Sequence, residues 1–199
     1  DTAKLESMRQ NGYELHCYCC SASQYKEEWG GIVVGESEGK VYFVLVDCGV
    51  WSVDGGQKKK TITRVAYKDF AHSPSKLKAT IAAVKEHHPD LRLVAAMELH
   101  TFSSLMASVL PQYKDCMQDA DIAYVYFNPK VIEHKRLTPI TSEDVANAFG
   151  TKNVEVFTDS PMLQARLREL DYRNTALLMM SSGTFDGIKI NDFAKELLQ

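Results

Sequence analysis

Residues 62–99 read ITRVAYKDFAHSPSKLKATIAAVKEHHPDLRLVAAMEL. The segment begins and ends with apolar runs that are typical of buried strands. Between the two runs, Leu77, Ile81 and Val84 recur at helical spacing after Pro74, and proline is favoured in the first turn of a helix. A strand, a helix and a second apolar strand predict two parallel strands joined by a right-handed crossover.

The same alternation continues along the rest of the chain. Three further apolar runs follow, namely IAYVYFN (122–128), VEVFT (154–158) and TALLMM (175–180). We expect helices at 142–149, after Ser160-Pro161 and from Asn191, and a helix within 103–120 that is broken near Pro111. Strands that are apolar on both faces are typical of a parallel sheet covered by helices on both faces. We therefore predict an α/β, Rossmann-like fold with a mainly parallel sheet of about five to six strands.

Residues 1–57 have a different pattern. They contain the short extended runs ELHCYCC (14–20), GIVVGE (31–36) and KVYFVLVD (40–47), separated by glycines. This pattern predicts a small β-rich segment that cannot bury a core alone. Gly55-Gly56-Gln57, followed by Lys58–Lys60, predicts a linker. We expect a β-rich part at 1–57 and an α/β domain at 58–199.

Composition excludes several classes of protein. The 199 residues are 45% hydrophobic and 25% charged, which is ordinary globular usage, and no apolar run approaches the roughly 18 residues of a membrane span. The N-terminal stretch shows no signal peptide, and a net charge of −3 disfavours a nucleic-acid partner. The five cysteines are unevenly spread, which indicates a reducing compartment, most simply the cytoplasm. We interpret Cys17, Cys19 and Cys20 as buried strand residues rather than zinc ligands.

The strand ends carry the candidate functional residues. In a parallel sheet, ligands bind beyond the carboxyl ends of the strands. Ser73 and Ser160 at these ends are interpreted as helix caps. The other polar and aromatic residues there are not needed as caps; they are Asp69, Phe70, His72, Glu98, His100 and Phe185. The Ser181–Thr184 loop offers backbone N–H groups that suit a carboxylate or phosphate. His87 and His88, which end a helix, are interpreted as solvated rather than metal-binding.

Three segments resemble motifs of the Mur ligase family, the ATP-dependent amide ligases of bacterial cell-wall synthesis. YKDFAHSPSKLKATIAAVK (67–85) is similar to the family motif D-D-Y-A-H-H-P, which opens a helix. MELHTFSS (97–104) and LLMMSSGTFDGI (177–188) agree with the family in order and spacing, and GGQKKK (55–60) resembles the start of its C-terminal domain. The resemblance covers about residues 56–199, and residues 1–57 look like a remnant of the end of the central ATPase domain. The nearest subgroup looks like the ligases that recycle murein tripeptide, with the alanine-adding ligases as neighbours.

The resemblance implies the function of an ATP-dependent acid–amino-acid ligase in peptidoglycan precursor synthesis or recycling. Such an enzyme joins an amino acid or peptide to UDP-N-acetylmuramate through an acyl phosphate, with ATP and with Mg²⁺ held mainly by the central domain. His72 would be catalytic, Asp69 would bind the ribose of ATP, and Phe70 would pack on its adenine. The remaining candidates would form the acceptor-substrate site; they are Glu98, His100, Ser103, Ser181, Ser182, Thr184 and Phe185. No metal ligand is implied in this part of the chain.

The implied partners are the nucleotide sugar, the acceptor and the central and N-terminal Mur domains of the same protein, with no nucleic acid and no membrane. The setting would be the cytoplasm, in the cell-wall synthesis that supports cell shape and division, and this fragment alone would be inactive. The segment departs from the family at several positions. Lys68 replaces an acidic residue of the family motif, Phe70 replaces a tyrosine and Ser73 replaces a second histidine. In addition, no arginine lies between Glu98 and Leu105. These departures leave a second hypothesis open, namely a catalytically inactive Mur-like module that binds ligands or regulates.

Overall fold

The computed structural model describes residues 28–30, 34–37, 40–54, 57–150 and 154–198. Its strands are β1 (Glu28–Gly30), β2 (Val34–Ser37), β3 (Lys40–Asp54), β4 (Gln57–Asp69), β5 (Arg92–Glu98), β6 (Ile122–Tyr126), β7 (Val154–Phe157) and β8 (Thr175–Met180). Its α-helices are α2 (Pro74–His87), α3 (Pro129–His134), α4 (Ser142–Phe149), α5 (Ser160–Arg168) and α6 (Ile190–Leu198). Two short 3₁₀ turns, η1 (Ser103–Leu105) and η2 (Leu110–Tyr113), follow β5.

The strands form one eight-stranded sheet in the order β1-β3-β4-β8-β5-β6-β7, with β2 also paired to β3. The five strands β4, β8, β5, β6 and β7 pair in parallel, whereas β3 runs antiparallel to β4. The five-stranded parallel sheet confirms the predicted α/β, Rossmann-like fold. Because the five strands point the same way, their carboxyl ends meet at one edge of the sheet.

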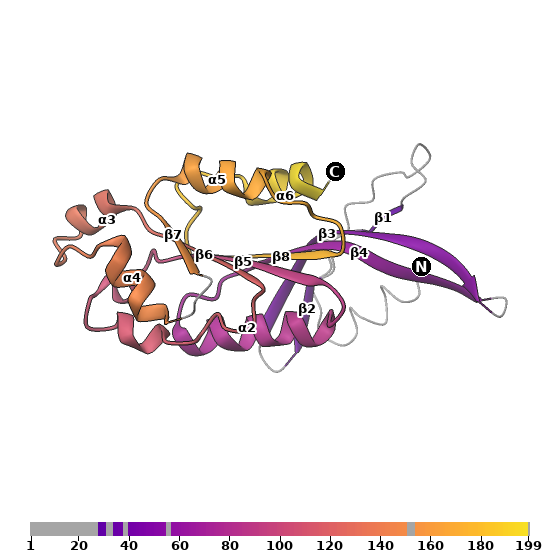
Figure 1. Ribbon diagram of the computed structural model, residues 1–199, viewed down its shortest axis with the longest axis horizontal. Coiled ribbons are helices and arrows are strands. Elements are labelled where there is room, and N and C mark those ends of the chain that lie inside the picture. The colour runs from indigo at the N-terminus through magenta and orange to yellow at the C-terminus, as the bar shows by residue number, and fades with distance from the viewer. Residues whose placement is uncertain (1–27, 31–33, 38–39, 55–56, 151–153, 199) are drawn as a thin grey trace.

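Helices cover both faces of the parallel sheet (Figure 1). Alternate residues of each strand point to opposite faces, so Leu93 and Met97 join one core cluster and Val94 joins the other. The first cluster includes apolar side chains of α2 and α4, and the second includes those of α5 and α6. Each face of the sheet therefore has its own hydrophobic core, as the apolar strand pattern predicts.

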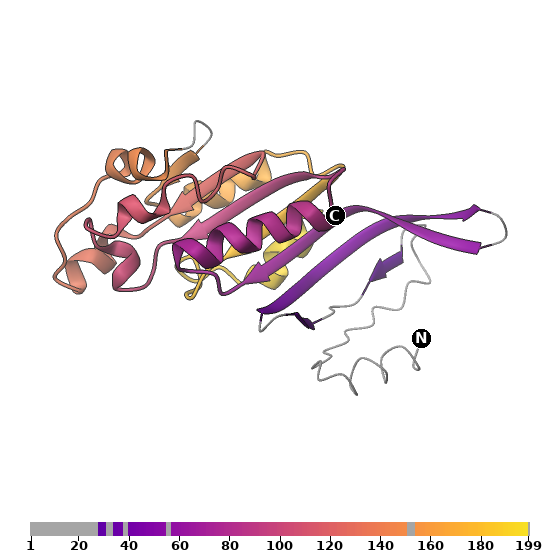
Figure 2. The same cartoon turned by 90° about the horizontal axis from the view of Figure 1, so that it is seen from below.

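The β3–β4 hairpin extends the sheet on its antiparallel side (Figure 2). Its register runs from Phe43 opposite Lys68 to Asp54 opposite Gln57. Lys58–Lys60 pair with β3, so the prediction of a linker there is wrong: antiparallel pairing carries the strand through the lysines. The expected domain boundary at 57/58 falls at the start of β4. Cys17, Cys19 and Cys20, which the sequence suggests lie in a buried strand, are outside the described residues.

Two further predictions are corrected. Residues 103–120, all of which the structure describes, contain the turns η1 and η2 instead of a broken α-helix, and Pro111 lies in the first turn of η2. His88 is buried rather than solvated, and its Nε2 atom lies 2.5 Å from the hydroxyl of Tyr67. None of the helices in the described ranges is long and apolar enough to cross a lipid bilayer.

Candidate functional site

The candidate site lies at the carboxyl edge of three neighbouring strands, β4, β8 and β5. Met180, the last residue of β8, is opposite Asp69 on one side and Met97 on the other. The backbone N–H of Ser181 donates a hydrogen bond to the carbonyl oxygen of Asp69 at 3.0 Å. The loop after β8 therefore begins in direct contact with the end of β4, although more than a hundred residues separate them in the sequence.

Asp69 presents a carboxylate whose orientation is fixed. Its Oδ1 atom accepts a hydrogen bond from the N–H of Ala71 at 2.9 Å, and its Oδ2 atom accepts one from the hydroxyl of Thr80 in α2, also at 2.9 Å. A carboxylate has about four lone-pair sites, so Asp69 can accept further hydrogen bonds. It is suited to bind a ligand with neighbouring hydroxyl groups.

Phe70 and His72 follow Asp69 at the open edge. Phe70 is 57% exposed, and the ammonium of Lys68 lies 6.0 Å from the centroid of its ring, within the range of a cation–π contact. Nδ1 of His72 lies 2.8 Å from the carbonyl oxygen of Phe70. Because a carbonyl only accepts, Nδ1 carries the hydrogen, and Nε2 is left to exchange hydrogen bonds or a proton with a ligand.

Tyr113 fixes the backbone beneath His72. Its hydroxyl donates to the carbonyl oxygen of His72 at 2.6 Å, and its ring stacks on Phe149 with centroids 5.1 Å apart. Burial, and then the nearby Cys116, raises the pKa of Tyr113 to about 12, so the hydroxyl stays protonated and remains a donor near neutral pH. The turn that carries His72 is thus anchored to the core.

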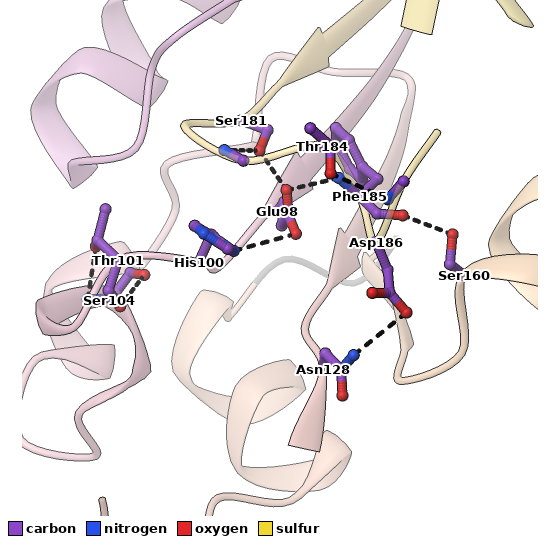
Figure 3. A network of polar contacts seen from close by, with 12 residues as sticks. Glu98, His100, Thr101, Ser104, Asn128, Ser160, Ser181, Thr184, Phe185 and Asp186 are labelled. Carbon is purple, nitrogen blue, oxygen red and sulfur yellow. Dashed lines mark hydrogen bonds and ion pairs between the residues drawn. The ribbon is translucent and has the colours of Figure 1, made fainter. Parts of the chain in front are cut away.

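Glu98 lies buried below the loop that follows β8 (Figure 3). Its Oε2 atom accepts hydrogen bonds from the hydroxyl of Ser181 and from the N–H of Phe185, the latter at 2.8 Å. Its Oε1 atom lies 3.5 Å from Nδ1 of His100, whose side chain is 42% exposed. Glu98 therefore contacts the loop directly, and its second oxygen lies beside the partly exposed His100.

The loop after β8 has an unusual backbone. Phe185, Asp186 and Gly187 have φ values of 50°, 61° and 94°, which is a strained conformation for a bulky residue such as Phe185. The carbonyl oxygen of Phe185 accepts from the hydroxyl of Ser160 at 2.6 Å, while the amide of Asn128 donates to Asp186 at 3.3 Å (Figure 3). The loop is therefore held by contacts from four places in the sheet, namely the ends of β5 and β8 and the segments that follow β6 and β7.

Gly183 brings the loop close to the end of β5. A Cβ atom at this position would lie 2.8 Å from Cγ of His100 and 2.9 Å from Oε2 of Glu98, which is too close for any side chain. Its own N–H donates to the hydroxyl of Ser181 at 2.6 Å. Only glycine lets the loop pack against His100 in this way.

Several polar groups of the loop have no partner in the part of the chain that the structure describes. They are the N–H groups of Ser182 and Thr184 and the buried hydroxyl of Ser182. Unpaired N–H groups near one another suit an anion such as a carboxylate. Lys135 adds positive charge at this end of the sheet, because its ammonium donates to the carbonyl oxygen of His100 at 2.7 Å.

The structure brings most of the predicted site residues to one edge. Asp69, Phe70 and His72 follow β4, Glu98 and His100 lie at the end of β5, and the Ser181–Phe185 loop follows β8. Ser103 lies apart on η1, where its hydroxyl is 3.3 Å from that of Thr101. Phe185 has a fully buried ring, so only its backbone is available at the edge, and Thr184 is exposed and accepts from the N–H of Gly187.

Four supporting residues were not identified from the sequence: Thr80, Tyr113, Lys135 and, as a functional residue, Ser160. Each contacts a residue at least 11 positions away in the chain, and no local pattern signals such a contact. The interpretation of Ser160 as a cap is wrong. The N-cap of α5 is Asp159, whose carboxylate accepts a hydrogen bond from the N–H of Met162. The hydroxyl of Ser160 instead donates a hydrogen bond to the carbonyl oxygen of Phe185.

The described residues do not fit a resident metal ion. Across the ranges that the structure covers, no three or more His, Cys, Asp or Glu side chains are grouped so that they could hold one. No chemical step is therefore assigned to Mg²⁺ in this part of the chain.

Comparison with known proteins finds similarity to ligases of peptidoglycan precursors. A UDP-N-acetylmuramate–L-alanine ligase from Lactococcus lactis subsp. cremoris is 30% identical over 111 residues, which are 53% of this chain and 24% of that protein. Over this segment the chain is similar in sequence to Mur ligases. It spans about a quarter of the length of the curated relatives that it matches. A scan against protein-family models gives no match.

Solved structures of Mur ligases resemble the chain to a limited degree. A domain assigned to a UDP-N-acetylmuramate:L-alanyl-gamma-D-glutamyl-meso-diaminopimelate ligase of Haemophilus ducreyi is 25% identical, with a TM-score of 0.45, and the match covers 67% of this chain and 90% of that domain. A murein peptide ligase from Psychrobacter arcticus is 15% identical, with a TM-score of 0.49, over 90% of this chain and 44% of that protein.

Proposed function

We propose that this chain supplies the C-terminal domain of an ATP-dependent amide ligase of peptidoglycan precursor synthesis or recycling. The sequence similarity to UDP-N-acetylmuramate–L-alanine ligases supports this proposal. The observation that carries it is the 3.0 Å hydrogen bond from Ser181 to Asp69, because it brings a candidate nucleotide-binding turn and a candidate carboxylate-binding loop to one edge. A ligase needs these two kinds of binding group side by side.

The proposed reaction has two steps. The γ-phosphoryl group of ATP is transferred to the carboxylate of UDP-N-acetylmuramate, giving an acyl phosphate and ADP. The amine of an amino acid or peptide then attacks the acyl carbon, and inorganic phosphate leaves from the tetrahedral intermediate as the amide bond forms. Holding the two reactants in line is worth up to about 7–11 kcal/mol in favourable systems.

Asp69, Phe70 and His72 bind the nucleotide in this proposal. Asp69 accepts hydrogen bonds from the ribose hydroxyls with its remaining lone pairs, and the exposed ring of Phe70 packs on adenine. Nδ1 of His72 is hydrogen-bonded to the carbonyl oxygen of Phe70, so Nε2 is the ring nitrogen that faces the reacting groups. His72 is the candidate catalytic residue of this chain.

The acceptor binds against the loop after β8. The unpaired N–H groups of Ser182 and Thr184 bind its carboxylate, and His100 borders the pocket. Ser103, which lies apart on η1, contacts only an acceptor that extends that far, and Glu98, Ser181 and Phe185 contribute through the loop that they hold. Whether the acceptor is an amino acid or a tripeptide is decided by comparing ADP release with each of them.

The rest of the enzyme lies outside the α/β domain. Residues 58–199 form the acceptor and nucleotide-clamping domain in this proposal, and residues 1–57 are the end of the central ATPase domain. The central domain supplies most contacts to Mg²⁺ and to the phosphates of ATP, and the N-terminal domain binds the nucleotide sugar. The enzyme works in the cytoplasm, in the cell-wall synthesis that supports cell shape and division, and the 199-residue chain alone does not ligate.

The test is ADP release by the polypeptide that joins this chain to its central and N-terminal domains. We expect release that depends on UDP-N-acetylmuramate together with L-alanine or the tripeptide L-alanyl-γ-D-glutamyl-meso-diaminopimelate. Asp69→Ala should raise the KM for ATP by at least about tenfold, since a hydrogen bond to a charged group contributes about 1.5–3 kcal/mol. Absence of release with either acceptor contradicts the proposal.

A second candidate function is a catalytically inactive Mur-like module that binds ligands or regulates. Lys68 in place of the family's acid, and the absence of arginine between Glu98 and Leu105, favour it, because an arginine there would suit a bidentate carboxylate clamp. Such a module would bind ADP or the tripeptide but release no ADP from ATP in the same assay.

A further inference from the structure

We propose that Glu98 is a positioning residue that holds the acceptor-binding loop in its strained conformation. The inference rests on the proposed function and deepens it. Glu98 is 4% exposed and touches two points of the loop, the hydroxyl of Ser181 at its start and the N–H of Phe185 four residues later. A buried carboxylate without such partners would be costly, so the loop and Glu98 stabilise each other.

The two ends of the Phe185 backbone are held from different strands of the sheet. Glu98, at the end of β5, accepts from its N–H, and Ser160, after β7, donates to its carbonyl oxygen. The ring of Phe185 is fully buried and lies 6.2 Å from that of Tyr126. These contacts explain how a phenylalanine remains at a φ of 50°, where its side chain is unfavourable.

The same contacts decide which N–H groups stay available. Gly183 donates to Ser181 and Phe185 donates to Glu98, whereas Ser182 and Thr184 donate to nothing in the described part of the chain. The loop thus presents alternate N–H groups to a ligand. Without the carboxylate of Glu98, the N–H of Phe185 loses its acceptor, and the loop can relax to an unstrained backbone in which this alternation is lost.

Both loop hydrogen bonds end on the same oxygen atom, Oε2, and this makes the proposal testable by two substitutions. Glu98→Gln keeps a carbonyl oxygen there and places its amide nitrogen toward His100, so the loop should be retained. Glu98→Leu has a similar volume and no acceptor, so the loop should be released. Tyr172→Phe is the matched control, because it removes a buried hydrogen bond to the carbonyl oxygen of Leu167 in the cluster that also contains Phe185, but this bond involves neither Glu98 nor the loop.

The first readout is amide hydrogen exchange of Phe185 in the 199-residue chain, which needs no ligand. We expect exchange to be at least about tenfold faster in Glu98→Leu, close to wild type in Glu98→Gln, and unchanged in Tyr172→Phe. Equal exchange in wild type and Glu98→Leu would overturn the inference, whatever the protein binds.

The second readout is the Kd of the tripeptide L-alanyl-γ-D-glutamyl-meso-diaminopimelate, measured by calorimetry on the same chains. Glu98→Leu should raise this Kd by about tenfold or more, whereas Glu98→Gln and Tyr172→Phe should stay within about threefold. An equal loss of affinity in Tyr172→Phe would mean that lower stability alone explains the effect and would overturn the positioning role. Absence of tripeptide binding by the wild-type chain would contradict the proposed acceptor instead, and the hydrogen exchange of Phe185 would still decide the role of Glu98.

Discussion

The hydroxyl of Thr80 donates a hydrogen bond to Oδ2 of Asp69 at 2.9 Å, across the turn between β4 and α2. Thr80 lies in the second turn of the helix and is 4% exposed, so this bond is largely shielded from water. It orients the carboxylate toward the edge of the sheet while leaving part of its accepting capacity open. The first turn of α2 has no acidic residue, and its N-cap, Ser73, makes no side-chain capping bond.

Thr80→Val should therefore weaken nucleotide binding as well as stability. Valine has nearly the same shape as threonine but no hydroxyl, so Oδ2 of Asp69 loses a donor. We expect the free energy of unfolding in urea to fall by about 1 kcal/mol and the Kd of ADP to rise. Thr158→Val is the control, because Thr158 is exposed and makes no hydrogen bond in the described part of the chain. Unchanged ADP affinity in Thr80→Val would contradict the role given to Asp69.

Tyr113→Phe tests the anchor below His72. Loss of the hydroxyl leaves the carbonyl oxygen of His72 without its 2.6 Å donor, and we expect the free energy of unfolding to fall by about 1 kcal/mol. Tyr172→Phe should cost a similar amount, because it also removes a buried hydroxyl that donates to a backbone carbonyl. Only Tyr113→Phe should lower kcat in the ADP-release assay. A similar fall in kcat for both variants would mean that His72 does not depend on this anchor.

The parallel sheet and its edge could be predicted from the sequence because both depend on local patterns. The apolar runs predict strands β5, β6, β7 and β8. The residues that follow these runs mark the carboxyl edge of the sheet. The 103–120 segment could not be predicted, since its spacing is compatible with a helix but Pro111 and the tertiary contacts favour short turns. The lysines of β4 have low strand propensity, and only their pairing with β3 explains their strand conformation.

The contacts within the candidate site could not be predicted for the same reason. Asp69, His72 and Glu98 are recognisable by residue type and position, but their partners Thr80, Tyr113 and Phe185 come from elsewhere in the chain. Ser160 next to a proline resembles a cap in sequence, and only the structure distinguishes its bond to Phe185 from the capping bond of Asp159.

Gly183→Ala should disrupt the edge more than its small size suggests. The added Cβ would lie 2.8 Å from His100 and 2.9 Å from Glu98, so the loop or His100 must move. We expect a loss of about 1–3 kcal/mol in the free energy of unfolding and a higher KM for the acceptor. Gly187→Ala offers a comparison, because a Cβ there meets no atom within 4 Å and only the φ of 94° is unfavourable. If Gly183→Ala kept the acceptor KM of wild type, the close packing of loop and His100 would not matter for binding.

The stability of the domain should depend on pH through Asp121. Burial alone would raise the pKa of this carboxyl, but the N–H of Leu93 and the ammonium of Lys85, each at 2.7 Å, outweigh burial and hold the pKa below its ordinary value. A lowered pKa in the folded state gives a contribution to stability that is present above the unfolded pKa of about 3.9 and is lost as the pH falls through the folded pKa.

Urea unfolding at about pH 6 and at about pH 3 checks this dependence. Asp121→Asn should lose less stability than wild type between the two pH values, whereas Asp119→Asn, at an exposed neighbouring position, should behave as wild type. Identical pH dependence in wild type and Asp121→Asn would contradict the role of this carboxylate.

The most direct test of the candidate site is an NMR titration of the 199-residue chain with the tripeptide L-alanyl-γ-D-glutamyl-meso-diaminopimelate, following each backbone amide. We expect the largest shifts at Ser182, Gly183 and Thr184, with smaller ones near His100. Shifts confined to the opposite edge of the sheet, around Arg92 and Thr175, or no shifts at millimolar tripeptide, would contradict a binding site at the carboxyl ends of β4, β5 and β8.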